Sequence, residues 1–164
     1  MTIPSIAIVG AGASGALLAV QLSLKVPAGT RITLIERNAQ FGVGLAYSTE
    51  NPNHLVNIPI GRMSAFDDQP NHFVDWIQRQ SPHIPGGAPA AESVFVPRHV
   101  YGAYLRDLLI TVKPAPERVH EEVVAIEVGE GLSLLRCASG RVLSASLVVL
   151  ATGNDRPRRR MYQG

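Results

Sequence analysis

The chain has 164 residues, of which 46% are hydrophobic and 17% are charged, and its formal net charge is +2. This composition is typical of one folded domain and excludes a disordered chain, and no apolar run reaches the roughly 18 residues of a membrane span. A single cysteine, Cys137, excludes an internal disulfide and the dithiol of a disulfide reductase, and it fits a reducing cytoplasm.

The basic residues are concentrated near the end of the sequence. Four arginines lie within residues 156–160, beside Pro157. A nucleic-acid interface instead requires basic side chains spread over one face of a fold. We therefore expect no nucleic-acid partner, and we interpret residues 155–164 as a basic tail or a truncated linker.

Residues 6–36 carry the most informative pattern. The apolar residues 6–9 precede a glycine turn at residues 10–15 (GAGASG), an apolar helical segment and a second apolar stretch that ends at Glu36. This order is the fingerprint of a dinucleotide-binding βαβ unit: a strand, a glycine turn, a helix and a second strand that ends in an acidic residue. The alternative is an ordinary βαβ unit without a ligand, because glycine-rich turns are common.

Each part of the fingerprint has a chemical role. Gly10 permits the tight turn out of the strand, Gly12 lets the backbone approach a pyrophosphate, and Gly15 lets the helix pack closely on the sheet. The pyrophosphate is expected at the amides of the helix N-terminus. The Glu36 carboxylate is expected to accept hydrogen bonds from the adenosine ribose and would repel the 2′-phosphate of NADP. The pattern thus disfavours NADP.

The middle of the chain combines loops and two helices. Residues 41–63 show no sustained period, which predicts a long ordered loop. Apolar residues at helical spacing predict a short helix at 70–80 and a longer one at 98–111, the second stopped by Pro114. The proline- and glycine-rich segment 81–97 between them is expected to be loop.

The last third has the period of strands. Residues 119–128, 132–137 and 141–143 are separated by glycine turns, which predicts an antiparallel meander. The continuously apolar residues 147–151 predict a buried parallel strand.

Further motifs accompany the βαβ unit. They are residues 42–48 (GVGLAYS), 54–57 (HLVN), 61–66 (GRMSAF), 72–73 (HF), 97–98 (PR), 101–105 (YGAYL) and the strand end Ala151-Thr152-Gly153. Together with the glycine turn and Glu36, these motifs resemble the bacterial FAD-NAD(P)-binding family over residues 4–154. That family is related to flavin monooxygenases, and its members are usually longer, with a second dinucleotide-binding domain. The resemblance implies a three-layer α/β Rossmann-like fold, in which a parallel sheet is crossed by an antiparallel β-meander.

The resemblance also implies a set of cofactor-binding residues. The glycine turn would hold the FAD pyrophosphate, and Glu36 would bind the adenosine ribose. Arg37 would flank the adenine. The strand end at residues 151–153 would lie beside the ribityl chain. The full set is Gly10, Gly12, Ala13, Ser14, Gly15, Glu36, Arg37, Met63, Ser64, Val123, Ala151, Thr152 and Gly153. The catalytic residues stay unassigned, and five histidines without ligand spacing predict no metal site.

We therefore expect residues 1–154 to be the FAD-binding domain of a flavin-dependent oxidoreductase, monooxygenase-like and with an unassigned substrate. NAD(P)H would be the reductant only with a second domain, and no second GxGxxG motif is present. This chain alone is expected to lack catalytic competence. The alternatives are a non-catalytic NAD- or ADP-binding module and an assembly subunit. We expect a cytoplasmic protein whose partner is its cofactor, together with either a second copy or a missing C-terminal domain.

Overall fold

Four strands form a parallel sheet at the centre of the fold. The computed structural model describes residues 4–81 and 91–153, and it gives this sheet the order β3-β2-β1-β7. The strands are β1 (Ser5–Val9), β2 (Arg31–Glu36), β3 (Glu117–His120) and β7 (Leu147–Leu150). Because all four run parallel, their carboxyl ends meet at one edge, where β1 passes into the glycine turn.

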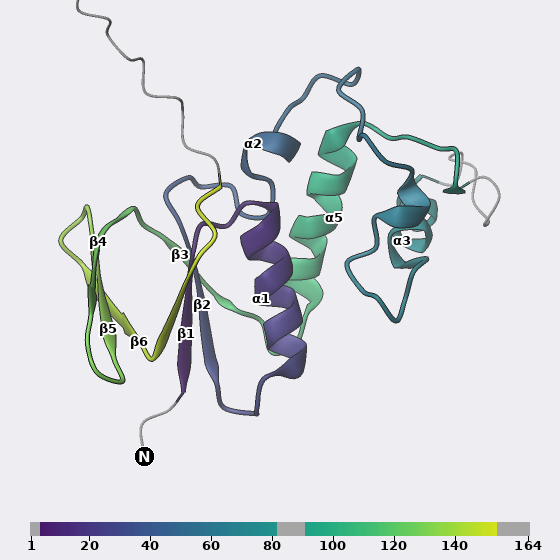
Figure 1. The fold of residues 1–164 in the computed structure, drawn as a ribbon. Coiled ribbons are helices and arrows are strands. Elements are labelled where there is room, and N and C mark those ends of the chain that lie inside the picture. The colour runs from purple at the N-terminus through teal and green to yellow at the C-terminus, as the bar shows by residue number, and fades with distance from the viewer. Residues whose placement is uncertain (1–3, 82–90, 154–164) are drawn as a thin grey trace, which may run out of the picture.

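Helices cover one face of the sheet and a meander covers the other (Figure 1). The helices are α1 (Ala13–Lys25), α2 (Gly44–Tyr47), α3 (His72–Gln80) and α5 (Arg98–Thr111), with a 3₁₀ turn η1 (Ile60–Arg62). The antiparallel meander is formed by β4 (Val123–Val128), β5 (Ser133–Cys137) and β6 (Val142–Ala145). The expected three-layer α/β architecture is confirmed. Of the described helices, none is long and apolar enough to cross a membrane.

Small residues bring α1 close to the sheet. Gly15, Ala16 and Ala19 are buried on one face of the helix, at the spacing of about one turn. Side chains without bulk let the backbones of helix and strand approach, which fixes the helix N-terminus beside the end of β1. The small residues on this face of α1 therefore also fix the position of the glycine turn.

An aromatic cluster joins α3 to α5. Phe73, Trp76, Tyr101 and Tyr104 are buried, with neighbouring ring centroids 4.8 to 6.3 Å apart. Such edge and tilted contacts are the arrangements that aromatic rings prefer. The cluster anchors α3 to α5, which in turn packs on α1.

Two strand predictions are wrong in part. Residues 119–128 do not form one meander strand, because β3 joins the parallel sheet beside β2 and the chain then turns into β4. The Glu121 amide donates to the Glu36 carbonyl at 2.9 Å, which marks the point of departure from the sheet. Residues 147–150 do form a parallel strand, but β7 lies at the edge of the described sheet, with Leu147 54% and Leu150 63% exposed.

The loops and helices are close to expectation. Both helix predictions are confirmed within two residues, and segment 41–63 is mostly irregular but contains α2 and η1. Part of the expected loop 81–97 and all of the proposed tail 155–164, with the boundary at 154, lie outside the described residues.

A partly buried hydrogen bond connects α3 to α5 through His72. The Tyr104 hydroxyl oxygen accepts a hydrogen bond from the Ala65 amide at 3.3 Å. The hydroxyl group can then donate its proton to Nδ1 of His72, which is 2.7 Å away. Burial, and then the charge of Arg79, lower the pKa of His72 below its usual 6.5. The neutral imidazole is therefore the form that the fold accommodates.

This arrangement predicts a pH-dependent stability. The unfolded chain binds the His72 proton more readily than the folded chain, so the free energy of unfolding should fall as the pH drops below about 6.5. Carboxylates at Asp75 and Asp107 oppose this shift but do not reverse it. In urea unfolding between about pH 7 and about pH 5, His72→Gln should show a flatter pH dependence than the unsubstituted chain. Parallel profiles would exclude His72 as the titrating group.

Candidate functional site

The turn between β1 and α1 is built by close backbone contacts. Gly10 has φ of +102°, and a Cβ placed there would collide with the Ala151 carbonyl oxygen at the end of β7. A Cβ on Gly15 would overlap the Gly10 carbonyl oxygen. Both positions therefore require glycine for this geometry.

Gly12 differs from the other two glycines of the turn. The nearest atom to a Cβ placed there is the Cα of Gly44, at 3.6 Å, which is an ordinary van der Waals contact. The fold thus accommodates a Cβ at Gly12, in contact with the backbone of Gly44.

The N-terminus of α1 has no side-chain cap. Gly12 is the N-cap residue, and the first turn contains no acidic side chain. The first hydrogen bond of the helix runs from the Ala16 amide to the Gly12 carbonyl, at 2.9 Å. The amides of Ala13, Ser14 and Gly15 consequently point outward at the positive end of the helix dipole, which is the arrangement that binds phosphate groups.

Glu36 ties the end of β2 to the turn. Its Oε2 accepts the Ala11 amide at 2.7 Å, and its Oε1 accepts the backbone and side-chain N–H groups of Asn38, both at 3.0 Å. The carboxylate is thereby held at the carboxyl edge of the sheet, next to the glycine turn. Carboxylate oxygens have further lone pairs and can accept additional donors from a ligand.

A second pair of glycines covers the turn from the other side. The Gly42 amide donates to the Ala11 carbonyl at 2.7 Å. Gly44 has φ of +53°, and a Cβ there would lie 3.0 Å from the Cα of Gly12. Sequence reasoning assigned no role to these residues, although the spacing of two glycines within three residues is the signal that could have indicated a close backbone approach.

The end of β7 lies beside the turn as expected. The Ala151 amide donates to the Val9 carbonyl at 2.8 Å, so β1 and β7 remain paired up to the site. Thr152 and Gly153 follow and are exposed. The structure thus brings this strand end together with Gly10 and Gly15.

Arg37 and Val123 flank the far side of Glu36. The Arg37 carbonyl is 3.1 Å from Nε2 of His120, and the Arg37 side chain is exposed. Because His120 pairs with Glu36 and the chain then turns into β4, Val123 begins close to the end of β2. These positions surround the place where an adenine would follow a ribose bound at Glu36.

Met63 and Ser64 follow η1, and neither makes a hydrogen bond to the turn among the described residues. Met63 is 6% exposed and belongs to the core under the helices. The Ser64 hydroxyl is engaged by the backbone of Phe66 and Gln69. The adjacent Ala65 carbonyl accepts Nε2 of Gln21, which lies roughly 12 Å along α1 from its first residue.

The titratable groups near the site show no metal or thiol chemistry. Within residues 4–81 and 91–153, His, Cys, Asp and Glu side chains form no cluster that could hold a metal ion. Cys137 is buried, and burial followed by the charge of Glu121 raises the pKa of its thiol. The site offers backbone amide donors at the N-terminus of α1 and one carboxylate acceptor at Glu36.

A family model and solved structures are similar to this chain. The model described as FAD-NAD(P)-binding matches residues 7–155. No curated protein matches. Among solved structures, FqzB has a TM-score of 0.63 at 15% identity, covering 93% of this chain and 37% of its own.

Two further structures are similar to the same extent. A mutant flavin monooxygenase from Stenotrophomonas maltophilia has a TM-score of 0.61 at 19% identity, with 91% of this chain and 38% of that chain covered. The bacillithiol disulfide reductase Bdr (YpdA) from Staphylococcus aureus has a TM-score of 0.62 at 16% identity, with 93% and 39% covered. These identities show a shared fold. The chain spans less than two fifths of the length of all three structures.

Proposed function

Because the chain belongs to the FAD-NAD(P)-binding family, we propose that it binds FAD and serves as the FAD-binding part of a flavin-dependent oxidoreductase. The observation that carries this proposal is the uncapped N-terminus of α1, placed beside Glu36, with no side chain at Gly12 to obstruct it. A diphosphate needs amide donors and room for close approach, and an adenosine ribose needs a carboxylate acceptor. The described residues fit both requirements.

The proposed contacts follow the geometry of the site. The amides of Ala13, Ser14 and Gly15 bind the pyrophosphate, and Gly12 has no side chain to obstruct it. Glu36 accepts the ribose hydroxyl groups, and the adenine lies between Arg37 and Val123. Thr152 and Gly153 lie beside the ribityl side. Met63 and Ser64 are proposed to contact the flavin from the segment that follows η1.

The flavin, when bound, supplies the redox chemistry, and the chain binds and orients it. A monooxygenase-like reaction is proposed because one structural neighbour is a flavin monooxygenase. NAD(P)H is the proposed reductant only together with a second dinucleotide-binding domain. Neither its site nor a substrate site is assigned to the described residues.

One observation favours a second candidate, a module that binds NAD or ADP without catalysis. The residues gathered at the turn, namely Gly12, the first amides of α1 and Glu36, bind the half that FAD, NAD and ADP have in common. Fewer of the proposed contacts, among them Thr152 and Gly153, concern the flavin half. The two candidates therefore differ in the ligand that the chain retains.

A titration separates these candidates. The visible absorption spectrum of the purified chain is recorded first, and the chain is then titrated with FAD, NAD and ADP by calorimetry. FAD binding that is tighter than ADP binding supports the flavoprotein proposal, because the flavin half then contributes affinity. Equal affinities for FAD and ADP support the nucleotide module, and no binding of any of the three excludes both.

Replacing Glu36 tests the ribose contact. Glu36→Ala should weaken FAD binding by about 1–3 kcal/mol, the range for hydrogen bonds to a charged group. It should also lower the free energy of unfolding, because the Ala11 amide loses its acceptor. Glu36→Gln keeps a carbonyl oxygen for Ala11 and is the matched control for stability. An unchanged FAD affinity in both variants would place the ribose elsewhere.

A further inference from the structure

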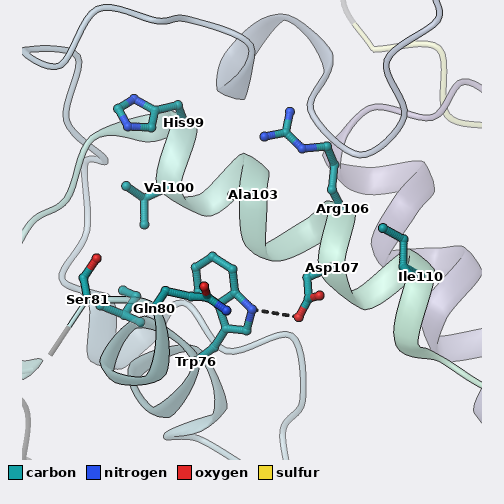
Figure 2. A pocket seen from close by; sticks show the side chains of 10 residues that line it. Trp76, Gln80, Ser81, His99, Val100, Ala103, Arg106, Asp107 and Ile110 are labelled. Atoms are coloured by element: carbon teal, nitrogen blue, oxygen red, sulfur yellow. Dashed lines mark hydrogen bonds between the residues drawn. The ribbon is translucent and has the colours of Figure 1, made fainter.

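A pocket of about 460 Å³ lies between α3 and α5 (Figure 2). It is lined by Trp76, Ile77, Gln80, Ser81, His99, Val100, Ala103, Arg106, Asp107 and Ile110. None of these residues belongs to β1, β7, the glycine turn or α1. The volume of the pocket is within the range of pockets that bind small molecules.

The floor of the pocket is apolar and rigid. Trp76 is 7% exposed and packs against Tyr104 at a centroid distance of 5.5 Å. Its indole Nε1 donates to Oδ2 of Asp107 at 2.8 Å, which fixes the orientation of the ring. Val100 and Ala103 on α5 complete an apolar surface that suits a ring or short aliphatic group.

Arg106 supplies an uncompensated positive charge at the same pocket. Over residues 4–81 and 91–153, the ion pairs are Arg62–Glu92 and Arg136–Glu127, so Arg106 forms none. Figure 2 shows its guanidinium turned away from Asp107, whose carboxylate faces Trp76. The stem of Arg106 lies close to Gly42, where a Cβ would come 3.3 Å from its Cγ. This contact restricts the path of the side chain.

We propose that this pocket is a second binding site, which takes a small molecule with an apolar ring and a carboxylate group. The ring lies over Trp76, and the carboxylate accepts paired hydrogen bonds from Arg106. A guanidinium presents donors in a planar fork that matches a carboxylate. The Asp107 carboxylate does not compete for Arg106, because the Trp76 N–H holds it on the opposite side.

The chain contains its own reporter for this site. Trp76 is the single tryptophan of the sequence, so all indole fluorescence arises from a residue that lines the pocket. We would titrate the purified chain with 3-phenylpropionate and, separately, with the neutral 3-phenylpropanamide. A saturable change in Trp76 emission is expected for the acid, with an affinity about tenfold or more above that of the amide.

Two variants give the control and the decisive comparison. Arg106→Gln should reduce the affinity for the acid to that for the amide, whereas Arg79→Gln, an exposed arginine of α3 outside the pocket, should leave it unchanged. Because Arg106 is exposed, its replacement is not expected to affect folding. Equal affinities of acid and amide, an unaltered affinity in Arg106→Gln, or no saturable change with either compound would overturn the proposal.

A further variant tests whether acid binding depends on the nucleotide site. Bound flavin quenches indole emission, so the same measurements are repeated in Gly12→Val, which is expected to lose the dinucleotide. Acid binding should be retained in that variant. Loss of acid binding there would show that the two sites are one, which contradicts the proposal.

Discussion

Replacing Gly15 by alanine is expected to lower the free energy of unfolding by about 3 kcal/mol, although alanine favours helix formation by about 1 kcal/mol over glycine. The added Cβ would overlap the Gly10 carbonyl oxygen. That oxygen belongs to the turn, which the Gly10 amide ties to the Ile35 carbonyl at 2.8 Å. The helix N-terminus must therefore move away from the sheet. Urea unfolding of the purified variant measures the loss.

Gly12→Ala is the matched control for this experiment. It adds the same methyl group to the same turn, but its nearest neighbour is the Gly44 Cα at 3.6 Å. Its free energy of unfolding should stay within about 0.5 kcal/mol of the unsubstituted chain. Equal losses in the two variants would show that the contact between Gly15 and Gly10 does not limit stability.

Gly12→Val is expected to reduce FAD affinity by at least about 100-fold, which corresponds to about 2.7 kcal/mol. The valine methyl groups would fill the space in front of the Ala13, Ser14 and Gly15 amides, which the pyrophosphate is proposed to occupy. The backbone of Gly12 has φ of −65° and ψ of −171°, which valine adopts without strain. Calorimetric titration with FAD measures the effect.

The fold of this variant should be retained. Its far-UV circular dichroism and melting temperature should match those of Gly12→Ala, which has a smaller side chain at the same position. If Gly12→Val binds FAD as tightly as the unsubstituted chain, the pyrophosphate does not lie at this turn. If its melting temperature falls sharply, contact with Gly44, rather than loss of the site, explains the result.

Much of the site could be predicted from the sequence because its main parts lie close together along the chain. Strand β1, the turn, α1 and Glu36 occur within 36 residues, and their periodicity and glycine spacing are local properties. The same holds for α3 and α5, whose apolar residues recur at helical spacing. The proximity of Ala151 to the glycine turn could also be predicted from the sequence, since adjacent parallel strands end at the same edge of a sheet.

Other features depend on partners far along the chain. A strand pattern in residues 119–128 does not reveal that Val119 pairs with Ile35 whereas Val123 pairs with Cys137. An apolar run likewise does not distinguish an edge strand from a central one, as β7 demonstrates. The contact between Gln21 and Ala65, 44 residues apart, likewise could not be predicted from either local segment.

The sequence by itself determined the class of fold, the glycine turn and the acidic residue at the end of β2, because backbone preferences and side-chain periods act over a few residues. Only the tertiary structure decided that Glu36 binds the Ala11 amide, that Gly44 approaches Gly12, and that α3 and α5 enclose a pocket beside Arg106. These features arise when packing brings separate segments within contact distance. The energy of such contacts depends on geometry that no single segment contains.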